Sequence, residues 1–224
     1  MSVTIDKLIR SKRKTVGLEV TPEALLIVRA PRNLSQKEIY EIVDKESRWI
    51  LKNQHFFRAN QSRIREKNFV EGEKFLFIGR SYRLRIVSNA PRKLTVDDKF
   101  FYLSEEWIDS AREIIESWYR QRANEVVSER AEYYSQLSGI KFKRVNITNA
   151  KKRWGSCGAR GQLNVAWRLV MAPLRVIDYV IVHELSHIKV RKHSASFWRT
   201  VEMTIPGYKL DEKWLRDNGH FLVL

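Results

Sequence analysis

The most restrictive feature of this chain is a stretch in which an apolar run leads directly into two histidines. Residues 176–182 are apolar almost throughout, and His183-Glu184-Leu185-Ser186-His187 follows them. A helix that is apolar on most sides is buried on most sides, so this stretch predicts a helix in the protein interior. Polar groups in such a helix need partners, because an unpaired polar group is costly to bury. The fold must therefore satisfy two imidazoles and a carboxylate on consecutive helical turns.

The spacing of these histidines favours a metal site. Residues four apart on a helix turn by about 400°, so His183 and His187 project from one face, one turn apart. With Glu184 they form the pattern H-E-x-x-H, in which two histidines bind zinc and the glutamate takes a proton from water. One cation would satisfy all three polar groups together. The sequence therefore predicts one Zn2+ per chain, with Glu184 as the catalytic base.

A third ligand is expected in the next segment. On an unbroken helix His193 would point about 240° away from His187, so a bend is required. Ser194 can supply it, because serine is a favoured N-cap and an apolar stripe runs from Phe197 to Val201. His193 is favoured, since zinc accepts imidazole readily. Glu202 is the alternative, as in zinc sites built from two histidines and one glutamate.

Further residues are expected beside the metal. Gly155 lies in a strand-like stretch, where glycine often marks the close approach of another chain or a ligand. Trp154 and Gly155 would then lie on an edge strand along which a peptide substrate pairs. A tight turn beside a core tryptophan is the alternative interpretation. Tyr208, Arg168 and the backbone of residues 153–157 are candidates for stabilising the oxyanion.

Several motifs around these residues resemble those of a known family. They are Arg153-Trp154-Gly155-Ser156-Cys157, Leu163-Asn164, Trp167-Arg168-Leu169, Asp178-Tyr179-Val180, the motif at residues 183–187, His193-Ser194 and Phe197-Trp198. The set resembles the YgjP-like metallopeptidase domain, which is related to the SprT/Spartan group of zinc proteases. The resemblance covers residues 104–224 in specific motifs and extends more loosely over the N-terminal half. It implies that His183, His187 and His193 bind zinc and that Glu184 is the catalytic base.

The chain is strongly basic, with a formal net charge of +16. Such a charge favours polyanionic partners such as nucleic acid, nucleotides or acidic proteins, although a solvated basic surface that keeps the protein soluble explains it equally well. The basic excess is larger in residues 1–103 than in residues 104–224. Residues 10–14 and residues 80–85 are the expected contact clusters. In the second cluster, strand alternation would place the arginines on one face of a sheet.

The sequence also predicts a compartment. The basic N-terminus has no apolar segment typical of a signal peptide, and no stretch is long enough to span a bilayer, so no membrane association is expected. A single cysteine, Cys157, excludes an internal disulfide framework and fits a reducing compartment. We therefore expect a cytoplasmic protein. Cys157 is expected as a small buried residue, and a regulatory or accessory thiolate ligand is the alternative.

The predicted fold class is α+β with two domains. Residues 1–103 are expected to form a basic, strand-rich N-terminal α+β module with one helix, which starts at a capping box at Ser35 and runs to about Asn60. Residues 104–224 are expected to form a zincin-like metallopeptidase domain. Its elements would be a long helix, a short mixed sheet and the H-E-x-x-H helix.

The boundaries in the second domain follow from caps and alternation. The long helix is expected from Ser104 to Gly139, with Trp107 and Leu137 among its core residues. Strands are expected at residues 143–149 and 162–171, and Pro173 is expected at the first position of the motif helix.

The predicted activity is the hydrolysis of peptide bonds by water that Glu184 activates at the zinc, with protein or peptide as substrate. One alternative is a metal-dependent nucleoside triphosphate pyrophosphatase, in which the basic surface would contact phosphates. The other is a non-catalytic nucleic-acid-binding module with structural zinc. Structural zinc sites usually close with four protein ligands, whereas three histidines leave one position open, which argues against this alternative.

Overall fold

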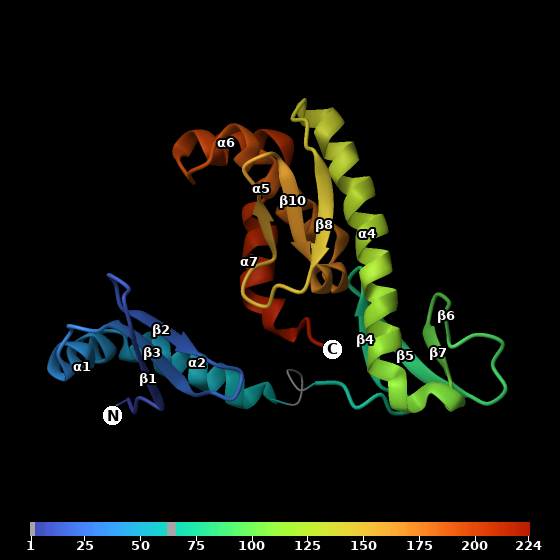
Figure 1. Cartoon of the computed structure of the whole chain (residues 1–224), viewed down its shortest axis with the longest axis horizontal. Coiled ribbons are helices and arrows are strands. Elements are labelled where there is room, and N and C mark those ends of the chain that lie inside the picture. The colour runs from blue at the N-terminus through green and yellow to red at the C-terminus, as the bar shows by residue number, and fades with distance from the viewer. Residues whose placement is uncertain (1–2, 62–65) are drawn as a thin grey trace. The chain divides into compact units, whose positions relative to one another are not determined.

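The computed structural model of the chain describes residues 3–61 and 66–224, which fold into two compact units, Met1–Arg65 and Glu66–Leu224 (Figure 1). Each unit has its own hydrophobic core. Both combine helices with small sheets, so the α+β class expected from the sequence is confirmed. In the part of the chain that is described, we found no helix with the length and apolar character needed to cross a membrane.

The first unit is a three-stranded sheet with two helices. Its strands have the order β1-β3-β2, with β1 parallel and β2 antiparallel to β3. Alternate residues Leu26, Val28 and Ala30 of the central strand are fully buried, as the period of two in a strand requires. The elements are β1 (Lys7–Ser11), β2 (Gly17–Val20), β3 (Leu26–Pro31), α1 (Gln36–Lys45) and α2 (Ser47–Ala59).

The single helix expected from Ser35 to about Asn60 is wrong in one respect, because it is divided in two. The capping box between Ser35 and Glu38 is present. Glu46, however, leaves the helical conformation (φ −94°, ψ 6°), so the chain changes direction between α1 and α2. Helical periodicity continues across this break because Ile39 on α1 and Ile50 on α2 are both buried in the core of the same unit.

The second unit starts with a four-stranded sheet of order β4-β5-β7-β6, in which β5 and β7 are parallel. Its buried face packs in one core with the long helix α4. Arg83 and Arg85 alternate with the buried Tyr82 and Leu84, so the two arginines share the exposed face, as the sequence predicted. The elements are β4 (Lys74–Phe77), β5 (Arg80–Val87), β6 (Leu94–Val96) and β7 (Phe100–Ser104).

The long helix differs from its prediction at its start and in its core residues. After Ser104 the chain forms a 3-10 helix, η1 (Glu105–Ser110), which is interrupted at Trp107, and α4 (Ala111–Ser138) follows. Gly139 ends α4 in the left-handed conformation (φ 67°), as expected. Leu137 is exposed because it lies off the buried stripe of α4, and Trp107 is exposed in η1, where its own backbone leaves the helical conformation (φ −114°, ψ 16°). The buried residues are Ala111, Ile115, Tyr119, Ala123, Val127, Ala131 and Tyr134.

The domain boundary expected near residue 104 does not coincide with the division into compact units at residues 65 and 66. Phe101 and Leu103 of β7 lie in the same hydrophobic core as Ile115 and Tyr119 of α4. Residue 104 therefore lies inside one compact unit. The domain boundary expected there stays a prediction.

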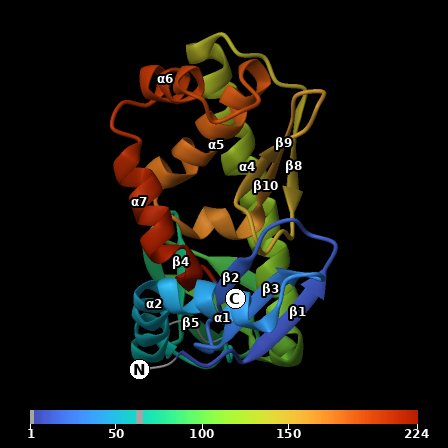
Figure 2. The ribbon, with the colours of Figure 1, turned by 90° about the vertical axis from the view of Figure 1, so that its left-hand side faces the viewer.

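Most of the remaining elements pack against α5, whereas β8 packs against α4 and η3 against α7 (Figure 2). A second sheet has the order β8-β10-β9, with β9 on one edge, antiparallel to β10. The strand expected at residues 162–171 ends at Ala166, where the chain turns into a 3-10 helix. The elements are β8 (Arg144–Thr148), β9 (Gly155–Cys157), β10 (Gln162–Ala166), η2 (Trp167–Met171), α5 (Leu174–Lys189), α6 (Ala195–Thr204), α7 (Lys209–Asn218) and η3 (Gly219–Phe221).

An ion pair joins the two longest helices of this unit. Asp178, which interrupts the apolar run of α5, is buried, and its carboxylate accepts two hydrogen bonds from Arg130 of α4, at 2.6 and 2.9 Å. The hydrogen bonds to Asp178 raise the pKa of Arg130 above its ordinary value. Pro173 precedes α5 as its N-cap, one position before the expected one.

We expect Arg130→Met to lower the free energy of unfolding by about 3 kcal/mol, because the variant leaves the Asp178 carboxylate buried without its partner. Arg122→Met on the same helix is the matched control, since Arg122 pairs with Glu125 at an exposed position. Its cost should be below about 1 kcal/mol. Urea unfolding measures both values, and equal losses in the two variants would contradict this account of the ion pair.

Candidate metal centre

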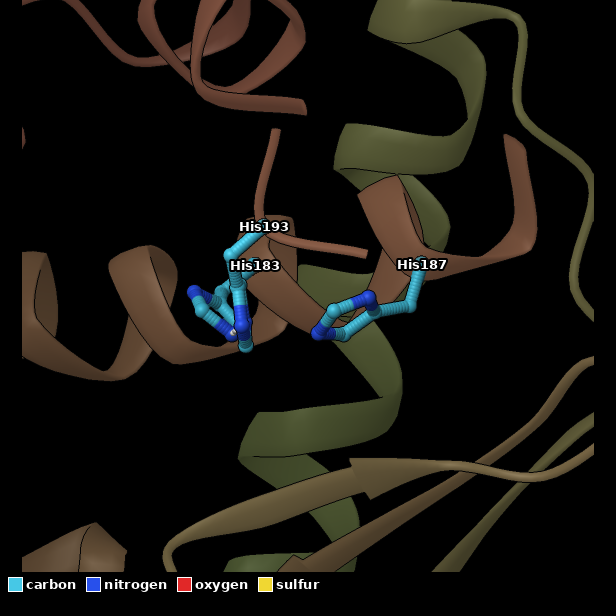
Figure 3. Close-up of side chains that lie close together, drawn as sticks. All are labelled: His183, His187 and His193. Carbon is cyan, nitrogen blue, oxygen red and sulfur yellow. Dashed lines mark hydrogen bonds between the residues drawn. The ribbon is translucent and has the colours of Figure 1, made fainter. Parts of the chain in front are cut away.

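Three histidines converge beside α5 (Figure 3). His183 and His187 lie one turn apart on α5, and His193 comes from the segment between α5 and α6. One nitrogen from each ring lies within 4.8 Å of the other two. The Nε2 atoms of His183 and His193 are 3.0 Å apart. Two nitrogens at zinc-binding distance on a tetrahedral ion lie about 3.3 Å apart, so this spacing fits a shared metal.

The bend that brings His193 back follows from local sequence. α5 ends at Val190, whose backbone is extended (φ −132°, ψ 106°). Ser194 is the N-cap of α6, and its side chain accepts a hydrogen bond from the Phe197 N–H. Glu202, the alternative ligand, lies outside the histidine group. Its carboxylate accepts a hydrogen bond from the Gly207 N–H at 3.2 Å and holds the turn after α6.

The two imidazoles on α5 have the protonation that a metal requires. Burial, and then the neighbouring histidines, lower the pKa of His183 to about 4, and burial also lowers the pKa of His187. Both rings are therefore neutral near pH 7, which metal ligation needs. His187 Nδ1 lies 3.2 Å from the Val190 carbonyl oxygen, which can only accept, so Nδ1 donates and Nε2 is left free to bind a cation.

Aromatic rings hold the histidines in place. The Phe197 ring centroid lies 4.5–4.9 Å from the centroids of all three imidazoles. The Trp198 ring stacks on the His193 ring, with 5.5 Å between the ring centroids, and on the Tyr208 ring, with 5.3 Å between the centroids. Tyr208 is therefore buried behind Trp198 and does not line the pocket at the histidines. Its expected part in oxyanion stabilisation stays a prediction.

Glu184 is buried against the edge strand. Burial raises its pKa to about 7, and the charge of Arg153 acts in the opposite direction. A Cβ at Gly155 would lie 2.6 Å from both Cγ and Oε1 of Glu184, so only glycine allows the strand to lie this close. A carboxyl group with a pKa near 7 is suited to accept a proton and return it. The close approach expected at Gly155 is therefore present, and its partner is the expected base.

The histidines open into a pocket of about 390 Å³. Its walls are the three histidines, Glu184, the three residues of β9 and Arg191. Trp154 and Arg168 lie outside this pocket. The Trp154 ring packs against Gly219, and Arg168 donates a hydrogen bond to Asn149, in the loop that leads to β9. The structure thus brings Gly155 to the site and leaves Trp154, Arg168 and Tyr208 around it.

Sequence reasoning did not single out Arg191 and expected Cys157 to be buried. Arg191 donates hydrogen bonds to the carbonyl oxygens of Gly158 and Ala159, at 3.3 and 2.9 Å, and so joins the end of α5 to the end of β9. Cys157, expected as a small buried residue, is only partly buried and lines the pocket, with its thiol 3.7 Å from the Arg191 guanidinium. The position of Arg191 two residues before His193 was the available signal for the first.

Three converging imidazoles beside a buried carboxylate define a site suited to metal-assisted hydrolysis. A family described as "YgjP-like, metallopeptidase domain" matches residues 14–218, and the chain belongs to this family. It is therefore a metal-dependent peptidase at the level of the family, as the resemblance in its motifs implied.

Comparison with solved structures found the metallopeptidase zymogen of Pyrococcus abyssi abylysin. It is 26% identical over 42% of this chain and 92% of that chain, with a TM-score of 0.37. No curated protein is similar enough to count as a match. The family match alone carries the assignment.

In the metal-free protein, Glu184→Gln should become more stable relative to wild type as the pH rises. Because the pKa of Glu184 is raised from 4.5 to about 7, the folded chain keeps a proton that the unfolded chain has lost. Wild-type stability therefore falls through this range, and the difference should grow by up to about 3 kcal/mol. The lowered pKa of His183 acts in the opposite direction in both proteins and cancels. Urea unfolding with chelator across this range measures the difference, and a constant value would refute the burial of this carboxyl.

Proposed function

We propose that the protein is a zinc peptidase in which His183, His187 and His193 hold one zinc ion per chain. The observation that carries this proposal is the convergence of three imidazoles beside a buried carboxylate. Bound there, zinc supplies the Lewis-acid chemistry of hydrolysis, for which three protein ligands leave one position open. The donor set fits this metal, since imidazole is among its preferred ligands.

Glu184 acts as the general base and then as the general acid. Its carboxylate accepts a proton from the attacking water and returns it to the nitrogen of the leaving amine. Gly155 holds the carboxylate in place by packing against it, and burial keeps its pKa at about 7. At this pKa the group can both accept and return a proton near neutral pH.

The substrate is protein or peptide and lies along β9. This strand pairs with β10 on one side only, so its other backbone edge has no strand partner among the described sheets, and its three residues line the pocket. An extended peptide can add to such an edge through main-chain hydrogen bonds. Bound in this way, its scissile carbonyl would lie beside the histidines. Trp154, Arg168 and Tyr208 support the walls of the site from outside the pocket.

Nucleoside triphosphate hydrolysis is the second candidate, and the observation that favours it is Arg191 in the pocket wall. A guanidinium is suited to phosphate as well as to carboxylate. We further propose that the protein acts in the cytoplasm, which the free cysteine supports. Nucleic acid remains a proposed partner of its basic surface.

We expect His193→Ala to lower zinc affinity at least about a hundredfold, because it removes one of three ligands. Glu202→Ala is the control and should bind zinc as wild type does, since its carboxylate is occupied by Gly207. Bound zinc per chain and competition with a chromogenic chelator measure the effect. Loss of zinc in Glu202→Ala with full binding in His193→Ala would assign the third ligand to Glu202.

We expect Glu184→Gln to keep its zinc and to lower kcat/KM on peptides about a thousandfold, because an amide cannot accept the proton of the water. Glu202→Gln is the matched control and should stay active. Each zinc-loaded protein is incubated with an unfolded protein and, separately, with nucleoside triphosphates. Undiminished peptide cleavage by Glu184→Gln would refute Glu184 as the general base. Pyrophosphate release without peptide cleavage would instead support nucleoside triphosphate hydrolysis.

A further inference from the structure

The positive charge of the chain is concentrated in the segment that builds the pocket. Residues 133–201 contain thirteen lysines and arginines and only two acidic residues, so they carry +11 of the net charge of +16. All of these cations except Arg168 are exposed, and one of the exposed cations, Arg175, is paired with Asp211 of α7. β9, α5 and the segment carrying His193 all lie within this stretch. The surface around the histidines is therefore cationic. Comparing the charge of residues 1–103 with that of residues 104–224 does not reveal this local excess of positive charge.

Neither acidic residue of this segment can neutralise that surface. Asp178 is buried and bound by Arg130, and Glu184 is buried against Gly155. Between Glu132 and Glu202 the chain thus places no carboxylate at the protein surface. A surface with one sign of charge attracts ligands of the opposite sign and orients them as they approach.

Two arginines lie at opposite ends of the edge strand. Arg153 is exposed and precedes β9 by two residues, and its charge acts on Glu184 inside the site. Arg191 is also exposed and is anchored to the carbonyl oxygens of Gly158 and Ala159 just after β9. Among the described residues neither arginine forms an ion pair. From Arg153 to Gly158 the chain covers about five residues, or roughly 16 Å of extended peptide.

The aromatic rings at the site indicate that the anionic partner is a polypeptide. Single-stranded nucleic acid is bound by exposed rings on which its bases stack. Here Phe197 and Trp198 pack against the histidines, and Trp154 packs against Gly219. The edge strand, in contrast, offers backbone groups to an extended peptide.

We infer that the protein selects acidic polypeptide segments, which lie along β9 with carboxylate side chains on both sides of the scissile bond, paired with Arg153 and Arg191. This inference rests on the proposed peptidase function and specifies its substrate class. Arg153 and Arg191 are specificity-determining residues in this account, since they contact substrate side chains away from the reacting atoms.

The test uses three fluorescent peptides that differ only in the residues flanking a common central segment, which are glutamate, glutamine or lysine. Fluorescence anisotropy measures their binding to the zinc-loaded Glu184→Gln chain, so that binding is read without cleavage. The glutamate peptide should bind about tenfold more tightly than the glutamine peptide at low salt, and the lysine peptide should bind most weakly. This preference should shrink at high salt, because exposed ion pairs are screened.

Variants made in the same background assign the preference to residues. Arg153→Gln and Arg191→Gln should each reduce it, and together they should abolish it. Arg191→Lys separates charge from loop support, because lysine keeps the charge and cannot donate the same paired hydrogen bonds to residues 158 and 159. It should retain the preference. Arg144→Gln, an exposed arginine on β8 that does not line the pocket, is the control and should leave the preference unchanged.

Equal binding of the three peptides, or an unchanged preference in the double variant, would overturn the inference. A competition experiment gives a third test, in which a single-stranded oligonucleotide of the same total charge and unlabelled glutamate peptide each displace the labelled glutamate peptide. Displacement by the oligonucleotide at the lower concentration would also overturn the inference, because the occupant would then be nucleic acid. With Glu184 restored, cleavage of all three peptides at one rate would refute acidic selection and leave the peptidase intact. Selective binding without cleavage of any peptide would refute the peptidase and leave the selectivity standing.

Discussion

Burial of α5 forces polar groups into the interior, and much of the second unit is arranged around the need to satisfy them. The helix carries Asp178, His183, Glu184 and His187 among apolar residues. Each lost hydration when it was buried, and an unpaired polar group in such a place costs free energy. Arg130 supplies the partner for Asp178, and Val190 accepts from His187. One nitrogen from each of the three histidines converges on one point, where a cation can bind them together, while Nδ1 of His183 is buried without a hydrogen-bond partner among the described residues.

The same burial prepares the site for chemistry. Removal from water keeps the imidazole of His183 neutral and raises the pKa of Glu184 to about 7, two opposite shifts with one cause, because burial disfavours whichever form is charged. Neutral imidazole binds metal, and a carboxyl group with this pKa exchanges protons near neutrality. Gly155 completes the arrangement, since any side chain there would displace Glu184. The edge strand is thereby held against the base.

Charge adds a second level of organisation. The segment that supplies the ligands also supplies most of the positive charge, and its two carboxylates are both buried. The two basic clusters that the sequence predicted as partner contacts, residues 10–14 and residues 80–85, lie outside this segment. In the first of them, Arg10 donates hydrogen bonds to backbone carbonyls of residues 31, 32 and 34 and so stabilises its own unit. In the second, Arg85 pairs with Glu71. Clusters of basic residues in the sequence show where positive charge lies along the chain. They do not show which of these side chains already form hydrogen bonds or ion pairs within the protein.

The sequence by itself determined the elements whose signals are local. The motif spacing, the capping box at Ser35, the left-handed cap at Gly139 and the N-cap at Ser194 follow from neighbours within four residues, and the structure contains each of them. Only the tertiary structure decided the breaks at Glu46 and Trp107, the burial stripe of α4, and the proximity of Arg191 and Cys157 to the histidines. These depend on packing between segments distant in sequence. The local sequence pattern indicates which residues require burial or a hydrogen-bonding partner. The fold alone determines which distant residue packs against them or pairs with them.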